Sequence, residues 1–287
     1  MHLVLISGLS GSGKSIAINV LEDAGYYCVD NLPSALLIDL VEELRRKGYR
    51  RVGVAMDVRS GEGIRELPRL LEQLKSANTT VSFLFLDAKD DTLLRRFSET
   101  RRRHPLAREG RTLAEAIREE RQLLATVAGL GHRIDTSDLK AATLRAWVHQ
   151  FVTLEPGQGL TLFFQSFGFK HGIPLDADLV FDVRCLPNPY YDLELRPLTG
   201  QDQPVADYLE AQAEVLEMRQ DIFRFVSRWL PAYIRDSRSY LTVAIGCTGG
   251  QHRSVYLVEW LASQFKDQAR DLRVLRRHRE LAGSAHG

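Results

Sequence analysis

A short glycine-rich segment near the start of the sequence has the spacing needed to hold a nucleotide phosphate. Residues 8–15, GLSGSGKS, match the pattern G-x-x-x-x-G-K-[ST], with an apolar run before them and helical periodicity after them. Glycines let such a loop turn its backbone N–H groups toward phosphate oxygens, and the helix adds the partial positive charge of its N-terminus. The lysine supplies charge to the β- and γ-phosphates, and the last serine can ligate Mg²⁺. The predicted phosphate-binding residues are Gly8, Leu9, Ser10, Gly11, Ser12, Gly13, the catalytic Lys14 and the metal ligand Ser15.

Aspartates follow three apolar runs that we expect to form parallel strands. Asp30, Asp57 and Asp87 each stand where such a run ends. The carboxyl ends of parallel strands meet at one edge of a sheet, which is also the edge of the glycine-rich loop. A carboxylate there could hold the water shell of a metal ion or orient a nucleophile, or it could simply cap the next helix or turn. The pattern does not choose between Asp57 and Asp87; we favour Asp57 as the catalytic carboxylate and expect Asp30 to face an acceptor or water.

An arginine-rich stretch follows the fourth predicted strand. Between residues 95 and 111, seven arginines stand against two acidic residues. Such a run is typical of a solvated face, but in P-loop kinases this position also carries a lid that closes over phosphates. Residues 134–137, IDTS, end the last strand of this half, where similar folds pass a loop beside the nucleotide base. Both interpretations of the arginine-rich stretch stay open at this point.

A second glycine-rich turn, residues 246–254 (GCTGGQHRS), lies in the other half of the chain between a predicted strand and a predicted helix. This position favours a backbone nest for an anion. The turn also fits C-x₅-R-[ST], the spacing by which cysteine phosphatases place a thiolate under a phosphate held by the arginine. A plain turn with Cys247 as a small core residue is a third interpretation. We favour a phosphate or sugar-phosphate site in which Arg253 binds the anion and Cys247 is not a nucleophile.

Three further polar clusters lie in this half. Residues 166–174 and 182–190 combine proline and glycine with lysine, histidine, asparagine and arginine at strand ends, which suits a polar, anionic ligand. The tail from Lys266 onward holds six Lys and Arg against three acids. Its arginines could contact RNA phosphates, or they could lie on a solvated terminal helix or strand. The residues assigned to RNA are Arg276, Arg277 and Arg279.

These residues must be positioned by alternating strands and helices, which predict an α/β fold with a parallel sheet covered on both sides. In the first half the strand candidates are residues 3–6, 26–29, 51–56, 81–86 and 132–134, and the helix candidates are 15–24, 34–47, 113–128 and 139–151. A second α/β unit follows, with strand candidates at 160–165, 178–184 and 240–245 and helix candidates at 205–230 and 254–266. Between them residues 154–159, LEPGQG, predict a linker, and so we expect domains at 1–154 and 155–287.

The composition of the 287 residues narrows the possible partners. With 38 Lys and Arg against 37 Asp and Glu the net charge is +1, so any nucleic acid or acidic surface must be met by a local patch. Three widely spaced cysteines argue against a disulfide framework and for a reducing, cytoplasmic setting. No apolar run approaches the ~20 residues that span a bilayer, and so no membrane partner is expected.

Together, several segments resemble the RapZ/YvcJ family of nucleotide-binding proteins over essentially the full length of the chain. They are residues 8–15, 22–33, 57–60, 100–105, 166–174, 182–189 and 246–254. The resemblance implies a kinase-like P-loop NTPase domain that binds and slowly hydrolyses ATP and GTP with Mg²⁺. It places a GTP-binding element on Asp57, Val58, Arg59 and Ser60.

The resemblance also implies roles for the C-terminal domain. In enterobacterial members this domain senses glucosamine 6-phosphate, binds a small regulatory RNA and delivers it to ribonuclease E. The corresponding sugar-phosphate residues would be Lys170, His171, Asn188, Thr248, Gly249, Gly250, His252, Arg253 and Ser254.

We therefore predict a homo-oligomeric, weak ATPase and GTPase coupled to a module that senses a phosphorylated metabolite. Two other functions stay open. One is an RNA-binding adapter that presents a small RNA to a ribonuclease, with nucleotide as a conformational switch. The other is a true small-molecule kinase. Salt-dependent RNA binding would support the adapter, and transfer of a labelled γ-phosphate would support the kinase.

Overall fold

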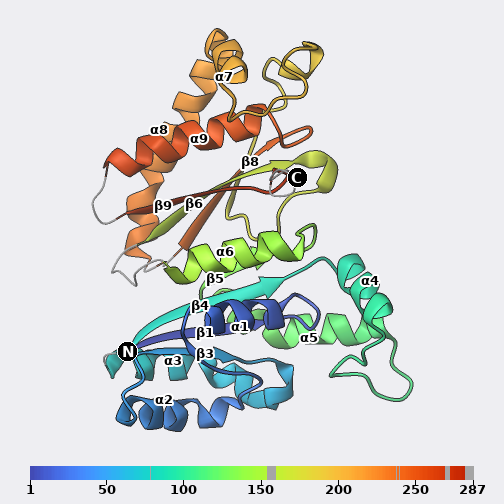
Figure 1. Ribbon diagram of the computed structural model, residues 1–287, viewed down its shortest axis with the longest axis vertical. Helices are drawn as coiled ribbons and strands as arrows, with labels where there is room; N and C mark the ends of the chain where they lie inside the picture. Colours follow the sequence, from blue (N-terminus) through green and yellow to red (C-terminus); the bar gives the residue numbers. More distant parts are fainter. Residues whose placement is uncertain (78, 154–159, 237, 239, 269–271, 282–287) are drawn as a thin grey trace. The chain divides into compact units, whose positions relative to one another are not determined.

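The computed structural model forms two compact units, Met1–Pro156 and Gly157–Gly287, each with its own sheet and core (Figure 1). It describes residues 1–281 apart from residues 78, 154–159, 237, 239 and 269–271; the side chains of residues 59–62, 267 and 268 are also left undescribed. The predicted linker at residues 154–159 therefore lies outside the described residues. Both units are mixed α/β structures with parallel sheets, which confirms the predicted fold class.

The sheet of the first unit has the strand order β2-β3-β1-β4-β5, and its paired strands all run parallel. Strand β1 is central, with β3 on one side and β4 on the other. The turn after β1, residue 57 after β3 and residue 87 at the end of β4 therefore share one edge of the sheet. The strands are β1 (His2–Gly8), β2 (Tyr27–Val29), β3 (Arg51–Ala55), β4 (Thr80–Asp87) and β5 (His132–Asp135).

Helices cover both faces of this sheet because alternate strand residues point to opposite sides. Leu3 and Leu5 of β1 pack in one core cluster with apolar side chains of α2, α3 and α5, while α1 contacts α6. Helix α5 spans the residues expected from the sequence and begins with a capping box between Thr112 and Glu115. The helices are α1 (Lys14–Asp23), α2 (Leu37–Arg46), α3 (Leu67–Ser76), α4 (Asp90–Thr100), α5 (Leu113–Ala128) and α6 (Ala141–Thr153).

The second unit has a four-stranded parallel sheet of order β7-β8-β6-β9. Its strands are β6 (Thr161–Gly168), β7 (Leu179–Asp182), β8 (Tyr240–Cys247) and β9 (Arg273–His278). Its helices are α7 (Gln203–Glu210), α8 (Ala213–Arg235) and α9 (Arg253–Gln268).

The single helix expected at residues 205–230 was wrong, because two helices, α7 and α8, occupy this stretch. The backbone of Gln212 is extended between them, with φ −98° and ψ 118°. The buried positions explain the break: Leu209 is followed by Val215, with no buried residue one helical turn after Leu209. One continuous helix could not keep these apolar residues on a single face across that gap.

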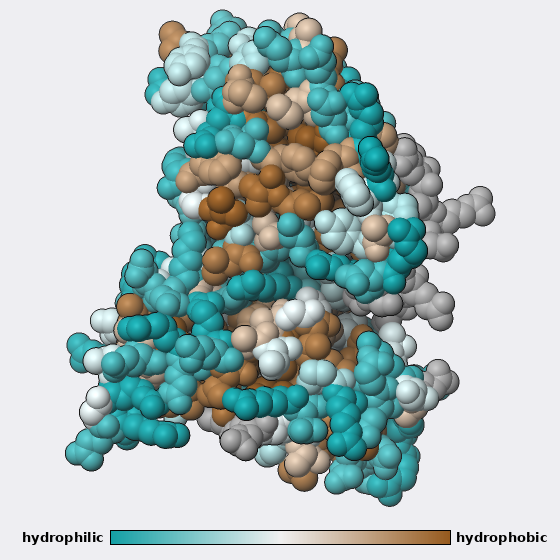
Figure 2. Space-filling model, turned by 180° about the vertical axis from the view of Figure 1, so that it is seen from behind, coloured by the Kyte–Doolittle hydropathy of each residue, from teal (hydrophilic) through white to brown (hydrophobic). Residues whose placement is uncertain are grey.

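Figure 2 shows apolar side chains gathered over part of the second unit and framed by polar ones. Large apolar side chains of this unit that remain exposed include Val180, Phe225, Trp229 and Ile234. Scattered exposed apolar residues are common, whereas gathered ones favour contact with another surface. Among the described residues, no helix is long and apolar enough to cross a membrane.

Candidate functional site

The glycine-rich loop of the first unit adopts a backbone that depends on its glycines. Gly8, Gly11 and Gly13 have φ values of +143°, +85° and +107°. A Cβ atom at Gly8 would lie 2.1 Å from the carbonyl oxygen of Leu86 on the neighbouring strand β4. Helix α1 then begins at Lys14 without a side-chain cap on its N-terminal N–H groups. An uncapped helix start inside a glycine loop is a suitable site for an anion such as phosphate.

Gly8→Ala should destabilise the protein strongly because both the φ value and the space exclude a side chain. We expect a loss of about 3 kcal/mol in the free energy of unfolding. Gly25→Ala is the matched control: its φ is +79°, but nothing lies within 4 Å of the added Cβ. Gly25→Ala should therefore lower the free energy of unfolding by only about 1 kcal/mol, the cost of the left-handed backbone for alanine. Urea unfolding of both variants measures the difference, and equal losses would contradict the steric explanation.

Two side chains hold carbonyl groups of the glycine-rich loop. Nη1 of Arg96 on α4 donates to the Gly11 carbonyl at 3.0 Å. The hydroxyl of Thr136 donates to the Ser12 carbonyl at 2.9 Å. Because the C=O and N–H of a trans peptide point in opposite directions, the second bond turns the Gly13 N–H to the other side. Residues 134–137, expected beside a nucleotide base, thus contribute Thr136 to the phosphate loop itself.

The charged and hydroxyl side chains of the motif lie at the start of α1. The Nζ of Lys14 donates to the carbonyls of Gly8 at 2.7 Å and Leu9 at 3.2 Å, so the ammonium lies over the loop. Ser15 is exposed at the first turn, whereas Ser12 is buried. The Lys14 ammonium and the exposed Ser15 hydroxyl therefore lie where the motif predicts phosphate and Mg²⁺.

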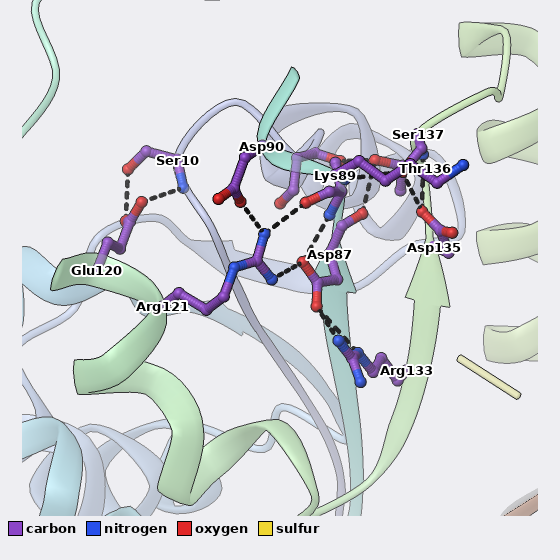
Figure 3. A network of polar contacts seen from close by, with 12 residues as sticks. Ser10, Asp87, Lys89, Asp90, Glu120, Arg121, Arg133, Asp135, Thr136 and Ser137 are labelled. Carbon is purple, nitrogen blue, oxygen red and sulfur yellow. Dashed lines mark hydrogen bonds and ion pairs between the residues drawn. The ribbon is translucent and has the colours of Figure 1, made fainter. Parts of the chain in front are cut away.

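Sequence reasoning missed a buried carboxylate beneath this loop. Glu120 on α5 is fully buried and accepts hydrogen bonds from the Ser10 N–H at 2.9 Å and the Ser10 hydroxyl at 2.7 Å (Figure 3). It also contacts His104 Nε2 at 3.1 Å. Burial disfavours its ionisation, yet hydrogen bonds from His104 and Ser10 and the charge of Lys14 hold the pKa of Glu120 below its ordinary value. Nothing in the sequence distinguishes Glu120 from other helical glutamates.

The structure separates the two aspartates that the sequence pattern could not. Asp87 is buried, and its two carboxylate oxygens are bound by the guanidinium groups of Arg121 and Arg133 (Figure 3). Those ion pairs tie β4 to α5 and β5, which is a structural role. Asp57 is buried just beyond β3, and Met56 before it donates a backbone hydrogen bond to Ile6 of β1. Asp30 is exposed after the edge strand β2.

The element predicted for GTP is described only in part. Val58 is buried and begins a 3₁₀ stretch, Val58–Glu66, directly after Asp57. Arg59 and Ser60 belong to that stretch, but their side chains lie outside the described part of the structure. Their assignment to a nucleotide therefore stays a prediction.

The arginine-rich stretch does not form one uniform face. Arg96 binds the phosphate loop, and Arg111 pairs with Glu119. The consecutive residues 101–103 are exposed and precede the buried His104. A solvated segment anchored at a buried histidine thus connects α4 to α5.

Two loops meet at the candidate anion site of the second unit. A Cβ at Gly168 would lie 2.8 Å from the carbonyl carbon of Gly249, and the Lys170 N–H donates to the Thr248 carbonyl at 3.3 Å. Gly250 has φ +74°. A Cβ at Gly250 would lie 2.6 Å from the Gly168 nitrogen, so this approach needs glycine at both 168 and 250. The two predicted ligand segments, residues 166–174 and 246–254, are therefore adjacent.

The side chains of the glycine turn take distinct roles. The sulfur of Cys247 is buried and accepts from the Gly250 N–H at 3.2 Å, and it lies 3.2 Å from the Ser254 hydroxyl. Arg253 is also buried; its Nη1 donates to the carbonyls of Arg184 and Leu186, each at 2.9 Å. Arg253 thus holds the neighbouring loop as well as facing the site.

A cavity of about 390 Å³ opens beside Arg253. Of the predicted ligand residues, Asn188, Thr248 and Arg253 line it. Lys170 and His171 are exposed on the adjacent turn, and His252 is buried, which lowers its pKa. Lining residues outside the predicted ligand set are Arg184, Cys185, Leu186, Pro187, Tyr191 and Glu214.

Two of the three arginines assigned to RNA are in the interior, which corrects that prediction. Arg277 and Arg279 are 3% and 7% exposed, and burial lowers the pKa of Arg277 to about 10. Arg277 lies in strand β9 and packs over the ring of Phe163, while Arg279, just after the strand, packs over the ring of Phe167. A basic run in the sequence therefore does not make a basic surface here. Arg276 is exposed but pairs with Glu259 at 2.7 Å. Buried guanidinium groups cannot reach RNA phosphates.

The parallel sheet, its strand order and the glycine turn from β1 into an uncapped helix define the first unit as a kinase-like P-loop fold. Residues 1–155 match the RapZ-like N-terminal domain, and residues 160–282 match the RapZ C-terminal domain. The chain belongs to the RapZ-like family, which confirms the resemblance inferred from its motifs.

Close relatives cover the whole chain. A protein of Dechloromonas aromatica (strain RCB), named nucleotide-binding protein, is 64% identical over 284 residues, covering 99% of this chain and 100% of its own. A nucleotide-binding protein of Azoarcus sp. (strain BH72) is 67% identical over 282 residues, covering 98% and 96%. Among solved structures, an unliganded sugar kinase from Janibacter sp. HTCC2649 is 18% identical with a TM-score of 0.36, covering 54% of this chain and 96% of its own.

Proposed function

We propose that the first unit binds ATP and GTP with Mg²⁺ and hydrolyses them slowly. The observation that carries this proposal is the uncapped N-terminus of α1 inside a loop whose glycines and Lys14 match a phosphate-binding motif. Relatives named nucleotide-binding proteins support it. Titration of the full chain with ATP and GTP, with and without Mg²⁺, tests it directly. Absence of saturable binding to either nucleotide would contradict it.

The residues at the loop fit a magnesium ion that arrives with the nucleotide. The exposed Ser15 hydroxyl would ligate it directly, and the Asp57 carboxylate would hold its water shell from the end of β3. The ion supplies charge that stabilises the transferring phosphoryl group. Lys14 adds a second positive charge, and the backbone N–H groups of the loop orient the phosphates.

Asp57→Asn should lower the hydrolysis rate about 10²-fold while changing nucleotide affinity much less, because the carboxylate acts on the metal and water. Asp87→Asn should instead cost about 2–3 kcal/mol of folding stability, since it removes the buried anion that pairs with Arg133 and one of the two carboxylates that pair with Arg121. Steady-state kinetics and urea unfolding of both variants separate the roles. A larger kinetic effect in Asp87→Asn would show that the catalytic carboxylate is Asp87.

For the second unit we propose a sensor of a phosphorylated metabolite resembling glucosamine 6-phosphate. The cavity offers Arg253 for the phosphate and Asn188 and Thr248 for hydroxyl groups. Glycine at positions 249 and 250 lets the backbone approach the ligand, and Ser254, next to Cys247, closes the turn. Lys170, His171 and His252 would complete the site from the adjacent segments.

An RNA adapter that acts with a ribonuclease is the alternative, with nucleotide as its conformational switch. Exposed arginines at residues 101–103, together with Arg276, are the observation that favours it. RNA binding through phosphates should weaken steeply with salt. Neutralising residues 101–103 should reduce that salt dependence, whereas Arg277→Gln should not, because Arg277 is buried. Salt-independent RNA binding would contradict a phosphate-based contact.

A further inference from the structure

The carboxylate of Glu120 joins two parts of the first unit that are far apart in the sequence. We call Ser10, Glu120 and His104 the buried bridge. Ser10 belongs to the phosphate loop, Glu120 to helix α5, and His104 to the connection between α4 and α5. The side chains of Glu120 and His104 are 0% and 1% exposed, so water does not compete for their contacts. The bridge is thus a direct, dry link between the phosphate loop and the arginine-rich connection.

The hydrogen bonds of the bridge have a fixed direction. The Leu106 N–H donates to Nδ1 of His104 at 3.1 Å, so Nδ1 carries no proton. The proton therefore lies on Nε2, which donates to Oε2 of Glu120 at 3.1 Å. The same Oε2 accepts from the Ser10 N–H, and Oε1 accepts from the Ser10 hydroxyl. A displacement of Leu106 would therefore move the His104 imidazole, and with it Glu120 and Ser10 of the phosphate loop.

Ring packing also holds His104 in this position. Its ring packs against Phe97 of α4 with the ring centroids 5.1 Å apart. The three exposed arginines at residues 101–103 directly precede it, and Arg101 has a left-handed backbone with φ 51°. An anion that binds these arginines would change the position of the adjacent residue, His104.

Stability alone is a poor explanation for the bridge. Taking a carboxylate out of water costs several kcal/mol, and buried charged groups are often no more stabilising than apolar side chains of similar size. The specific gain from Glu120 is geometric, because it fixes both the backbone and the side chain of Ser10 within the phosphate loop.

We propose that the buried bridge positions the phosphate loop for hydrolysis and couples it to the arginine-rich connection between α4 and α5. This inference rests on the proposed nucleotide hydrolysis. Glu120 and His104 are positioning residues: they act through Ser10 and touch no phosphate. Without them the loop keeps Lys14 and its glycines, so nucleotide still binds. The alignment for phosphoryl transfer is lost, and misplacement by about 1 Å can cost 10²-fold in rate.

The test compares full-length variants at His104 with a control variant at Thr112, the N-cap of the helix α5 that carries Glu120. His104→Phe keeps an aromatic ring beside Phe97 but removes both hydrogen bonds, whereas His104→Gln retains an N–H that can donate to Glu120. Thr112→Ala weakens the cap of α5 by about 1 kcal/mol without touching the bridge. The measurements are kcat and KM for ATP, and hydrogen–deuterium exchange of residues 8–15 without nucleotide.

We expect His104→Phe to lower kcat about tenfold to a hundredfold while KM changes by less than about threefold. Its residues 8–15 should exchange faster. His104→Gln should recover much of the rate, and Thr112→Ala should keep both kcat and exchange at wild-type values. Wild-type kcat and exchange in His104→Phe would overturn the proposal, and so would an equal loss in Thr112→Ala. If the wild-type protein does not hydrolyse ATP, the proposed function fails, while the exchange comparison still decides whether the bridge controls the loop.

Discussion

Lys14→Ala should lower nucleotide hydrolysis at least about 10²-fold, the scale of losing one preorganised charge at a transition state. The Nζ of Lys14 lies over the loop on the carbonyls of Gly8 and Leu9, from which it can turn to a bound phosphate. Removing the amine deletes the only side-chain charge that the motif brings to the phosphates. Phosphate release from ATP and GTP by the purified variant measures the effect.

Lys75→Ala is the control for this substitution, because Lys75 is an exposed lysine at the end of α3 paired with Glu72. It removes the same charge and should leave hydrolysis unchanged. Both variants should keep the second unit folded, since that unit has its own core. A Lys14→Ala protein that hydrolyses ATP at the wild-type rate would contradict the assignment of the loop.

Arg253→Ala should weaken binding of a sugar phosphate to the second unit by about one to two decades. Loss of a hydrogen-bonded charge costs roughly 1.5–3 kcal/mol, and each ~1.4 kcal/mol is tenfold in affinity. The structure adds a second reason, because Arg253 also holds the carbonyls of Arg184 and Leu186 on the loop that lines the cavity. Calorimetric titration of the full chain with glucosamine 6-phosphate and inorganic phosphate measures the change.

Cys247→Ser separates a binding nest from a nucleophile loop. Serine keeps the size and polarity of the residue and can still accept from the Gly250 N–H. Sugar-phosphate binding should therefore stay close to wild type, whereas Arg253→Ala weakens it. An aryl-phosphate hydrolysis assay tests the alternative. Turnover that depends on Cys247 would show phosphatase chemistry and contradict the binding nest. ATP hydrolysis by the first unit should change in neither variant.

The sequence predicted the strands of the first unit and β6, β7 and β8 of the second, because apolar runs between helical stretches are a local signal. It did not predict β9, whose run of arginines hides that signal. Gly8, Gly13 and Lys14 were predictable, since the motif contains its own spacing. The choice between Asp57 and Asp87 could not be predicted, because strands β3 and β4 flank β1 symmetrically in the sheet order. The contacts of Arg121 and Arg133 with Asp87 arise from tertiary packing and have no counterpart in the local sequence.

The roles of residues that act through contacts distant in sequence could not be predicted from the sequence. Glu120 is 110 positions from Ser10, and no local pattern marks their pairing. The arginines of the tail show the opposite problem: a basic run predicted a surface, but Arg277 is buried in strand β9 over the ring of Phe163. Propensity and charge describe the element, and tertiary packing decides which face is covered.

The position of β9 affects when each unit can fold during synthesis. The sheet and helices of the first unit end at Thr153, so that unit can fold while the rest of the chain is still being made. The second unit has no such freedom, because its central strand β6 pairs with β9, more than a hundred residues later. Until residues 273–278 emerge, one edge of β6 has no partner strand, and Ser166 lacks its contact with His278. Ribosome-bound chains that stop before β9 should therefore carry a folded first unit and a second unit whose sheet is incomplete.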